Sequence, residues 1–172
     1  MFQNNTVDIH QIPTYQNIVL NNLHENYKKV LKVNAVGYIF ISIAISIAVY
    51  FIFQETQKFI FIGVIMLLFS YIAIAPILAL KNKKYAFREH DVIFTKGLFT
   101  KSTHIVPYIR LQHVVIKQGW YAKKLGLASL KLYTAANDNV DVTIPGLTLQ
   151  DAERWKTFLL NRLQELEDDS NE

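Results

Sequence analysis

The chain has 172 residues, a formal net charge of +4, a hydrophobic fraction of 51% and no cysteine. The lack of cysteine excludes disulfides, thiolate metal sites and cysteine nucleophiles, and it fits a cytoplasmic domain. About forty residues lie in two long apolar runs, so the remainder is long enough for one small domain with its own core but not for two.

Residues 1–34 form a polar N-terminal segment without the pattern of a cleavable signal peptide. No apolar stretch follows a basic start, so we expect the first apolar run to serve as the targeting signal. From Tyr15 onward, apolar residues recur at helical spacing, at Val19, Leu23, Tyr27, Val30 and Leu31. This spacing predicts an amphipathic helix that lies along the membrane interface and continues into the first apolar run.

Residues 35–80 contain the two apolar runs, Ala35 to Phe53 and Phe59 to Leu80, which are separated by five polar residues. Neither run contains Asp, Glu, Lys, Arg or His. At about 1.5 Å of rise per residue, each run reaches across the roughly 30 Å hydrocarbon core of a bilayer. Buried helices of a soluble core would need a polar stripe, which these runs lack, so the sequence predicts a two-span transmembrane hairpin.

Basic residues flank the hairpin on one side only. They precede the first run and follow the second, at Lys28, Lys29, Lys32, Lys81, Lys83, Lys84 and Arg88. The connecting loop holds one lysine and one glutamate. By the positive-inside rule, both termini are predicted to lie in the cytoplasm, in a multi-pass protein of the bacterial inner membrane.

Small residues four positions apart occur twice in the first run, as Ser42 with Ser46 and as Ala44 with Ala48. This spacing lets a neighbouring helix approach closely, so these four residues are the candidate transmembrane packing positions. Neither run has a charged residue that would mark an ion path, which argues against a transporter that acts alone.

After Leu80 the apolar period changes from that of a helix to that of a strand. Short runs rich in β-branched and aromatic residues predict strands at 85–88, 92–95, 98–106, 111–118, 128–135 and 140–144. Alternation is clearest near the end, where Leu130 and Leu132 face one way and Ser129 and Lys131 the other. Such alternation is typical of half-buried antiparallel strands.

The last predicted element is an amphipathic helix that begins at Thr148, whose hydroxyl is positioned to cap it with Asp151 three residues later. Its apolar face, which includes Leu159, is predicted to pack against the sheet. The predicted fold class is a membrane α-helical hairpin plus a cytosolic α+β domain at 81–166, in which an antiparallel sheet or partly open barrel is closed by the C-terminal helix. An acidic tail follows at 167–172.

Three stretches of the predicted domain carry a resemblance to a known family: VPYIRLQHV at 106–114, KLGLASL at 124–130 and IPGL at 144–147. With them, residues 85–160 resemble the bacterial pleckstrin-homology domain of the YdbS-type membrane proteins, and the preceding hairpin fits the layout of that family. The resemblance implies a pleckstrin-homology-like fold and a membrane-anchored scaffold or lipid-facing module that works beside a larger partner with several such domains.

Basic residues are concentrated in the first part of this domain. Residues 81–135 hold eleven Lys and Arg against two acids, and residues 136–172 hold nine acids against three basic residues. Directly beneath a bilayer, such a surface is predicted to attract anionic headgroups, at about 1 kcal/mol per basic side chain. The alternative for most of these lysines is an ordinary solvated strand face. The candidate lipid- or partner-binding residues are Lys96, Lys101, Arg110, Lys117, Trp120, Lys123, Lys124 and Lys131.

Two of these candidates have competing interpretations. Arg110 is placed either to bind a phosphate or a partner's carboxylate through its planar fork, or to tie its turn to backbone carbonyls or to Asp151 or Glu153. Trp120 is placed either to anchor its segment at headgroup level or to cap the domain core.

Patterns that indicate catalysis are absent from the sequence. His90, His104 and His113 are candidate metal ligands, but imidazoles without a convergent carboxylate or thiolate make a weak site. No nucleophile elbow, phosphate-binding loop or zinc-protease motif occurs. We therefore expect no enzyme activity, no catalytic residue, no metal and no cofactor, and no nucleic-acid partner.

Together these features predict a non-catalytic, membrane-anchored scaffold or binding protein that assembles homo- or hetero-complexes at the cytoplasmic face, in envelope stress or toxin defence. Its expected partners are the lipid bilayer with its anionic headgroups, further copies of the chain, or a larger multi-domain homologue. The alternative is an accessory subunit of a membrane transporter or exporter whose other chains supply the polar pathway. A lipid-modifying enzyme is the least favoured hypothesis.

Overall fold

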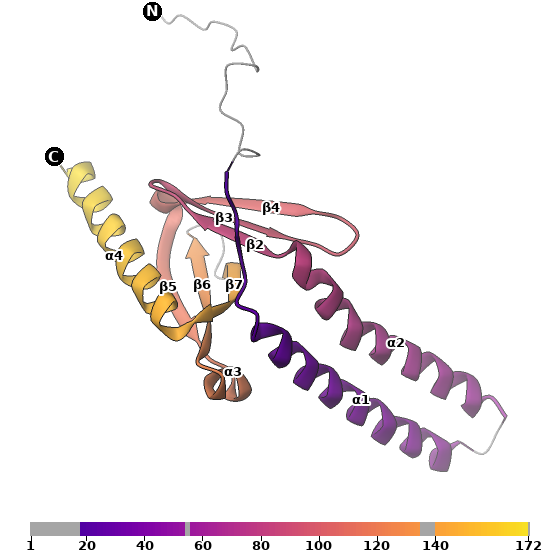
Figure 1. The fold of residues 1–172 in the computed structure, drawn as a ribbon. Helices are drawn as coiled ribbons and strands as arrows, with labels where there is room; N and C mark the ends of the chain where they lie inside the picture. Colours follow the sequence, from indigo (N-terminus) through magenta and orange to yellow (C-terminus); the bar gives the residue numbers. More distant parts are fainter. Residues whose placement is uncertain (1–17, 54–55, 135–139, 172) are drawn as a thin grey trace, which may run out of the picture.

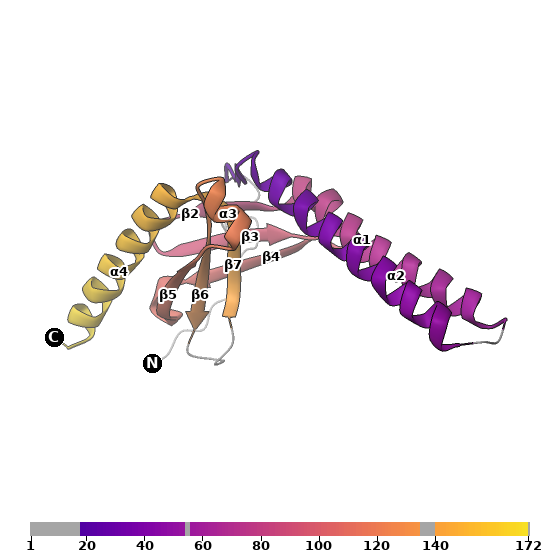
Figure 2. The same ribbon diagram turned by 90° about the horizontal axis from the view of Figure 1, so that it is seen from below.

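The computed structural model describes residues 18–53, 56–134 and 140–171. A pair of long helices projects from a small domain of strands, and a further helix lies across the strands on the side away from the pair (Figures 1 and 2). The chain enters the pair from the domain and returns from the pair to the domain. The two domain-side ends of the pair therefore lie near each other.

The pair consists of α1 (Tyr27–Ile52) and α2 (Lys58–Leu78), and α2 continues into a short 3-10 helix, η3 (Ala79–Asn82). Both helices are long and apolar enough to cross a membrane. Only 6% of the apolar part of each helix is buried inside the protein. Apolar surface of this extent needs a lipid environment, as expected for the predicted hairpin.

Ser42 lies between the two helices of the hairpin and is 3% exposed. Its hydroxyl donates to a carbonyl of its own helix at 2.8 Å and contacts the Met66 sulfur at 3.6 Å. The hydroxyl of Ser46 is also buried, without a hydrogen-bond partner in the described part of the chain. Ala44 and Ala48 are exposed. The serine pair therefore lies inside the hairpin, and the alanine pair lies on its outer surface.

The segment before α1 is extended rather than helical. β1 (Asn21–Asn22) pairs antiparallel with β2 (Lys84–Phe87), and the side chain of Leu23 is buried in the domain core. Pairing with a sheet edge satisfies backbone groups that would otherwise bond within a helix. The predicted interfacial helix is therefore wrong over the described residues before Tyr27, and its first three residues lie outside the described part.

The described residues of the domain form two antiparallel sheets, ordered β1-β2-β3-β4 and β5-β6-β7. The remaining strands are β3 (Asp91–Lys96), β4 (Ser102–Pro107), β5 (Leu111–Lys117), β6 (Leu127–Thr134) and β7 (Val140–Thr148). A short helix, η4 (Tyr108–Arg110), leads from β4 to β5, and no ladder joins these two strands among the described residues. The predicted fold class, an open antiparallel barrel with a C-terminal helix after a helical hairpin, is confirmed.

Local features of the chain explain where the strands differ from prediction. β4 begins at Ser102 because Gly97 turns the chain with φ +142°, and a Cβ there would lie 1.9 Å from the carbonyl oxygen of Thr100. β7 continues past Pro145 because its ladder with β6 shifts register at that point, where a proline is tolerated. The short helix α3 (Trp120–Lys124) was not predicted, since five residues show no helical period.

The C-terminal helix α4 (Leu149–Asn171) packs across the strands (Figure 1). It begins with the predicted cap, because the Asp151 N–H donates to the Thr148 hydroxyl oxygen at 3.1 Å. Trp155 of α4 stacks on Phe87, with ring centroids 4.0 Å apart. The buried core that α4 completes includes Leu130, Leu132, Ile144, Leu147 and Leu159.

Candidate functional site

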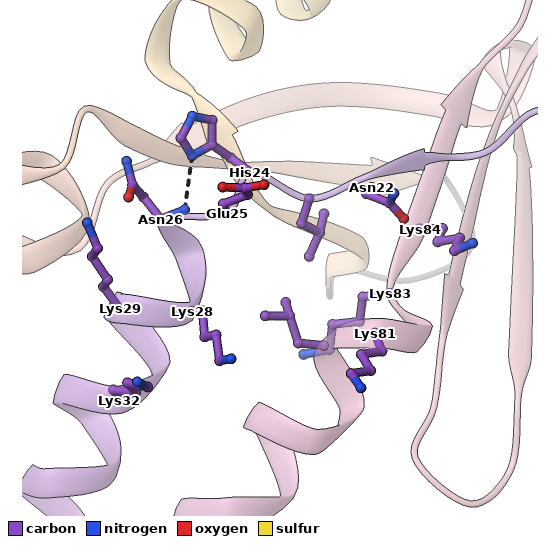
Figure 3. A pocket seen from close by; sticks show the side chains of 12 residues that line it. Asn22, His24, Glu25, Asn26, Lys28, Lys29, Lys32, Lys81, Lys83 and Lys84 are labelled. Carbon is purple, nitrogen blue, oxygen red and sulfur yellow. Dashed lines mark hydrogen bonds between the residues drawn. The ribbon is translucent and has the colours of Figure 1, made fainter.

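A cavity of about 850 Å³ opens where the helix pair meets the strand domain (Figure 3). One wall comes from the end of the extended segment and the first turns of α1, and the other from η3 and the start of β2. The lining residues are Asn22, Leu23, His24, Glu25, Asn26, Lys28, Lys29, Lys32, Leu80, Lys81, Lys83 and Lys84. The hairpin thus brings together two stretches that are far apart in the sequence.

Six lysines and one glutamate line this cavity, which we call the lysine cavity. Three of the lysines come from the first turns of α1, one from η3 and two from the entry into β2. Within the part of the chain that the structure describes, none of the six forms an ion pair, and Glu25 forms none either. The cavity therefore has a net positive charge, and its described lysines are not held in ion pairs, an arrangement that favours an anionic ligand.

Lys83 shows the electrostatic consequence of this arrangement. Burial lowers the pKa of its amine below the usual value, and the charge of Lys96 lowers it further. In Figure 3, Lys28 points from α1 across the cavity toward the opposite wall, where Lys83 follows η3. A poorly solvated ammonium group beside other cations is stabilised when an anion arrives, and the phosphate of a lipid headgroup is such an anion.

Backbone contacts fix the α1 wall of the lysine cavity. The N–H of His24 donates to the carbonyl of Gly146 on β7 at 2.9 Å, and the N–H of Asn26 donates to Nδ1 of His24 at 3.2 Å (Figure 3). Gly146 adopts φ +65°, and its Cα lies against the ring of Tyr27 so closely that no side chain fits between them. These contacts start α1 at a fixed point on the domain, and the lysines of its first turns are positioned as a result.

The candidate residues predicted from the sequence fall into separate groups. Lys96 and Lys101 flank the turn between β3 and β4, Trp120, Lys123 and Lys124 lie on α3, Lys117 and Lys131 lie on β5 and β6, and Arg110 ends η4. None of these eight lines the lysine cavity. All are exposed except Lys131, which is half-buried.

The surroundings of Arg110 and Trp120 distinguish between the two roles that the sequence allows for each. Arg110 lines a separate cleft of about 320 Å³ with His104, and the other lining residues come from β4, β6 and β7. Within the described residues its guanidinium forms no ion pair with Asp151 or Glu153, so that structural role is not observed. Trp120 is 70% exposed and therefore does not cap the core.

The histidines do not converge in the structure. The described residues contain no group of three or more His, Cys, Asp or Glu side chains that could hold a metal ion. His113 stacks on Tyr133, with ring centroids 4.2 Å apart, and Nε2 of His104 is buried without a hydrogen-bond partner among the residues that the structure describes. His90 is exposed.

In the sequence, the cavity lysines indicated the orientation of the hairpin in the membrane. They were not predicted to form a binding site together. The available signal was their position, because antiparallel packing of two spans must bring both flanking groups to the same end. What the sequence did not indicate was the extended segment at Asn21–Asn22, which closes the cavity from the domain side.

A hairpin of two membrane-crossing helices joined to an open antiparallel barrel with a C-terminal helix defines a membrane protein with a pleckstrin-homology-like domain. The family model described as "Bacterial PH domain" matches residues 30–165, and the chain belongs to this family. A relative named UPF0699 transmembrane protein YdbS, from Bacillus subtilis (strain 168), is 34% identical over 110 residues, which cover 63% of this chain and 67% of the relative. No solved structure matches the chain significantly. The family resemblance of the three sequence stretches is confirmed.

Proposed function

We propose that this protein is a non-catalytic, membrane-anchored binding module that holds its pleckstrin-homology-like domain against the membrane by binding anionic phospholipid headgroups. The observation that carries this proposal is the lysine cavity at the domain end of the hairpin, whose positive charge has no partner within the described residues. A headgroup phosphate there would meet lysines from both walls. Binding would therefore join the hairpin to the domain.

Simple electrostatics supports this assignment. Each basic side chain near an anionic leaflet contributes about 1 kcal/mol, and the lysines act together within a Debye length of about 8 Å at physiological ionic strength. The volume of about 850 Å³ is larger than a single phosphate needs and falls in the range of ligand cavities. A complete headgroup therefore suits it better than a free inorganic ion.

A scaffold role at the membrane is the second part of the proposal, with a further copy of the chain or a larger multi-domain homologue as the partner. β4 pairs only with β3 among the described residues, so its other edge is free to accept a strand. Ile105 and Ile109 beside this edge are exposed. Co-purification in mild detergent separates this role from that of a transporter subunit, since a channel or ATPase partner would favour the latter.

The orientation of the hairpin is the third part, and the lysine asymmetry supports a cytoplasmic location for both termini. A cysteine at exposed Gln57, between the helices, should react with a membrane-impermeant thiol reagent in intact spheroplasts. A cysteine at exposed Gln164 on α4 should not react. Because the chain has no native cysteine, each label reports on one site. Labelling at Gln164 without labelling at Gln57 would reverse the orientation.

Charge reversal in the lysine cavity should weaken the binding of anionic lipid. In the variant with Lys28→Glu and Lys81→Glu, repulsion replaces attraction at one position on each wall. We expect the affinity for phosphatidylglycerol to fall tenfold or more, since about 1.4 kcal/mol corresponds to a factor of ten. Native mass spectrometry of the full chain in detergent, with phosphatidylglycerol or phosphatidylcholine added, measures the lipid that stays bound.

The matched control makes the same change in net charge away from the cavity, on α4, with Arg154→Glu and Lys156→Glu. Its lipid binding should be close to that of the wild type. An equal loss in both variants would assign the effect to net charge rather than to the cavity. A wild-type protein with no preference for phosphatidylglycerol would overturn the headgroup site and leave only the scaffold role.

A further inference from the structure

Two large aromatic side chains lie exposed outside the helix pair. Phe99, in the turn between β3 and β4, is 86% exposed, and Trp120, at the start of α3, is 70% exposed. Scattered apolar residues on a soluble surface need no explanation, but these two belong to different elements that both adjoin the hairpin. Whether Phe99 and Trp120 can contact the bilayer depends on where each side chain lies relative to α1 and α2.

The turn that carries Phe99 is tied to the end of α2. The side-chain amide of Asn82 donates to the carbonyl of Gly97 at 3.0 Å, so the turn lies where the chain leaves the second span. Figure 1 shows the β3–β4 turn on the same side of the domain as the end of α2. The positive φ of Gly97 makes the turn tight, and Leu98 and Phe99 follow directly. Lys96 and Lys101 flank them and are exposed.

Trp120 lies beside the other helix of the pair. Together with Val33, Gly37, Tyr38 and Ile41 of α1, it lines a shallow groove of about 320 Å³. Three of these α1 residues fall within the first apolar run, so the indole lies at the depth where the span begins. Two lysines accompany it on α3, and the amine of Lys124 is 5.5 Å from the centroid of the Trp120 ring.

We propose that Phe99 and Trp120 insert into the interfacial layer of the leaflet next to the domain, and that they dock the edge formed by the β3–β4 turn and α3 onto the membrane. The amphipathic indole of Trp120 favours the headgroup level, the ring of Phe99 buries its apolar surface at the boundary with the acyl chains, and neighbouring lysines extend toward the phosphates. Docking of this edge requires only that α1 and α2 span the bilayer. It does not rest on the lysine cavity, whose charge-reversal variant should leave it unchanged.

The first test uses the tryptophan fluorescence of the full chain in phosphatidylcholine and phosphatidylglycerol vesicles. The sequence has two tryptophans, so Trp155→Phe leaves Trp120 alone and Trp120→Phe leaves Trp155 alone. Lipids brominated on their acyl chains should quench Trp120 several-fold more than Trp155, which stacks on Phe87 in the domain. Equal quenching of the two, or none of Trp120, would overturn the proposal for α3.

The second test places a polarity-sensitive dye on a cysteine, because the chain has none of its own. Phe99→Cys should give a blue-shifted emission in vesicles that brominated lipid quenches. Leu160→Cys is the matched control, since Leu160 is 40% exposed and belongs to α4, which lies on the side of the domain away from the helix pair. An unshifted dye at residue 99, or equal shifts at both sites, would overturn the proposal. A shift at residue 99 that depends on protein concentration and resists brominated lipid would also overturn it, in favour of contact between copies.

Discussion

Replacing Leu159 by Asp should unfold the pleckstrin-homology-like domain and leave the hairpin in the membrane. The side chain of Leu159 is 0% exposed and belongs to the same buried core as Leu132 and Val142. A carboxylate there has no partner, and an unpaired buried charge costs several kcal/mol. Since small domains are stable by only about 5–15 kcal/mol, this single change is expected to remove most of the folded population.

Limited proteolysis of membranes measures the result, because the folded domain resists cleavage and the unfolded one does not. Leu160→Asp is the matched control, since Leu160 is the next residue of α4 and is 40% exposed. The control should keep wild-type resistance, and both variants should stay in the membrane fraction. If the Leu159 variant were as resistant as the control, α4 would not pack on the sheets as the structure shows.

The strands and the last helix were predictable because their signals are local. Alternating residues such as Leu130, Leu132 and Val142 are buried in the core, as the period of two requires. Thr148 and Asp151 form the cap that their spacing indicates. The alternation of a strand and the cap of a helix each depend on residues that are close together in the sequence.

The extended segment before α1 was missed because it depends on contacts across the chain. Asn21 pairs with Tyr85, which is distant in sequence, and nothing in the flanking residues indicates that pairing. The apolar spacing around Leu23 therefore suggested a helix, although Leu23 is in fact a residue of the domain core. The lysine cavity depends on the same pairing, because β1 is what holds the start of α1 beside β2.

The helical hairpin is joined to the barrel at both of its ends, and we call this region the junction. α1 does not start in a free linker, since the residues before it pair with β2 and donate a hydrogen bond to Gly146 of β7. α2 runs through η3 directly into β2. The walls of the lysine cavity are therefore connected to both sheets through short segments and hydrogen bonds.

Substituting Gly146 by Ala should weaken this junction more than the same substitution at Gly126. Both glycines have a left-handed conformation, with φ +65° at Gly146 and φ +67° at Gly126. Alanine in that conformation costs about 1–2 kcal/mol at either site. A Cβ at Gly146 would also lie 2.7 Å from Cγ of Tyr27, whereas a Cβ at Gly126 meets nothing within 4 Å.

The difference between the two variants therefore isolates the contact between α1 and β7. We expect the melting temperature of the full chain in detergent to fall clearly further for Gly146→Ala, because the ring of Tyr27 or the backbone of β7 must move. In a double-mutant cycle, Tyr27→Ala should make the further cost of Gly146→Ala fall to that of Gly126→Ala. Equal losses for the two glycine variants, or no coupling to Tyr27, would show that α1 is not fixed against the domain at this point.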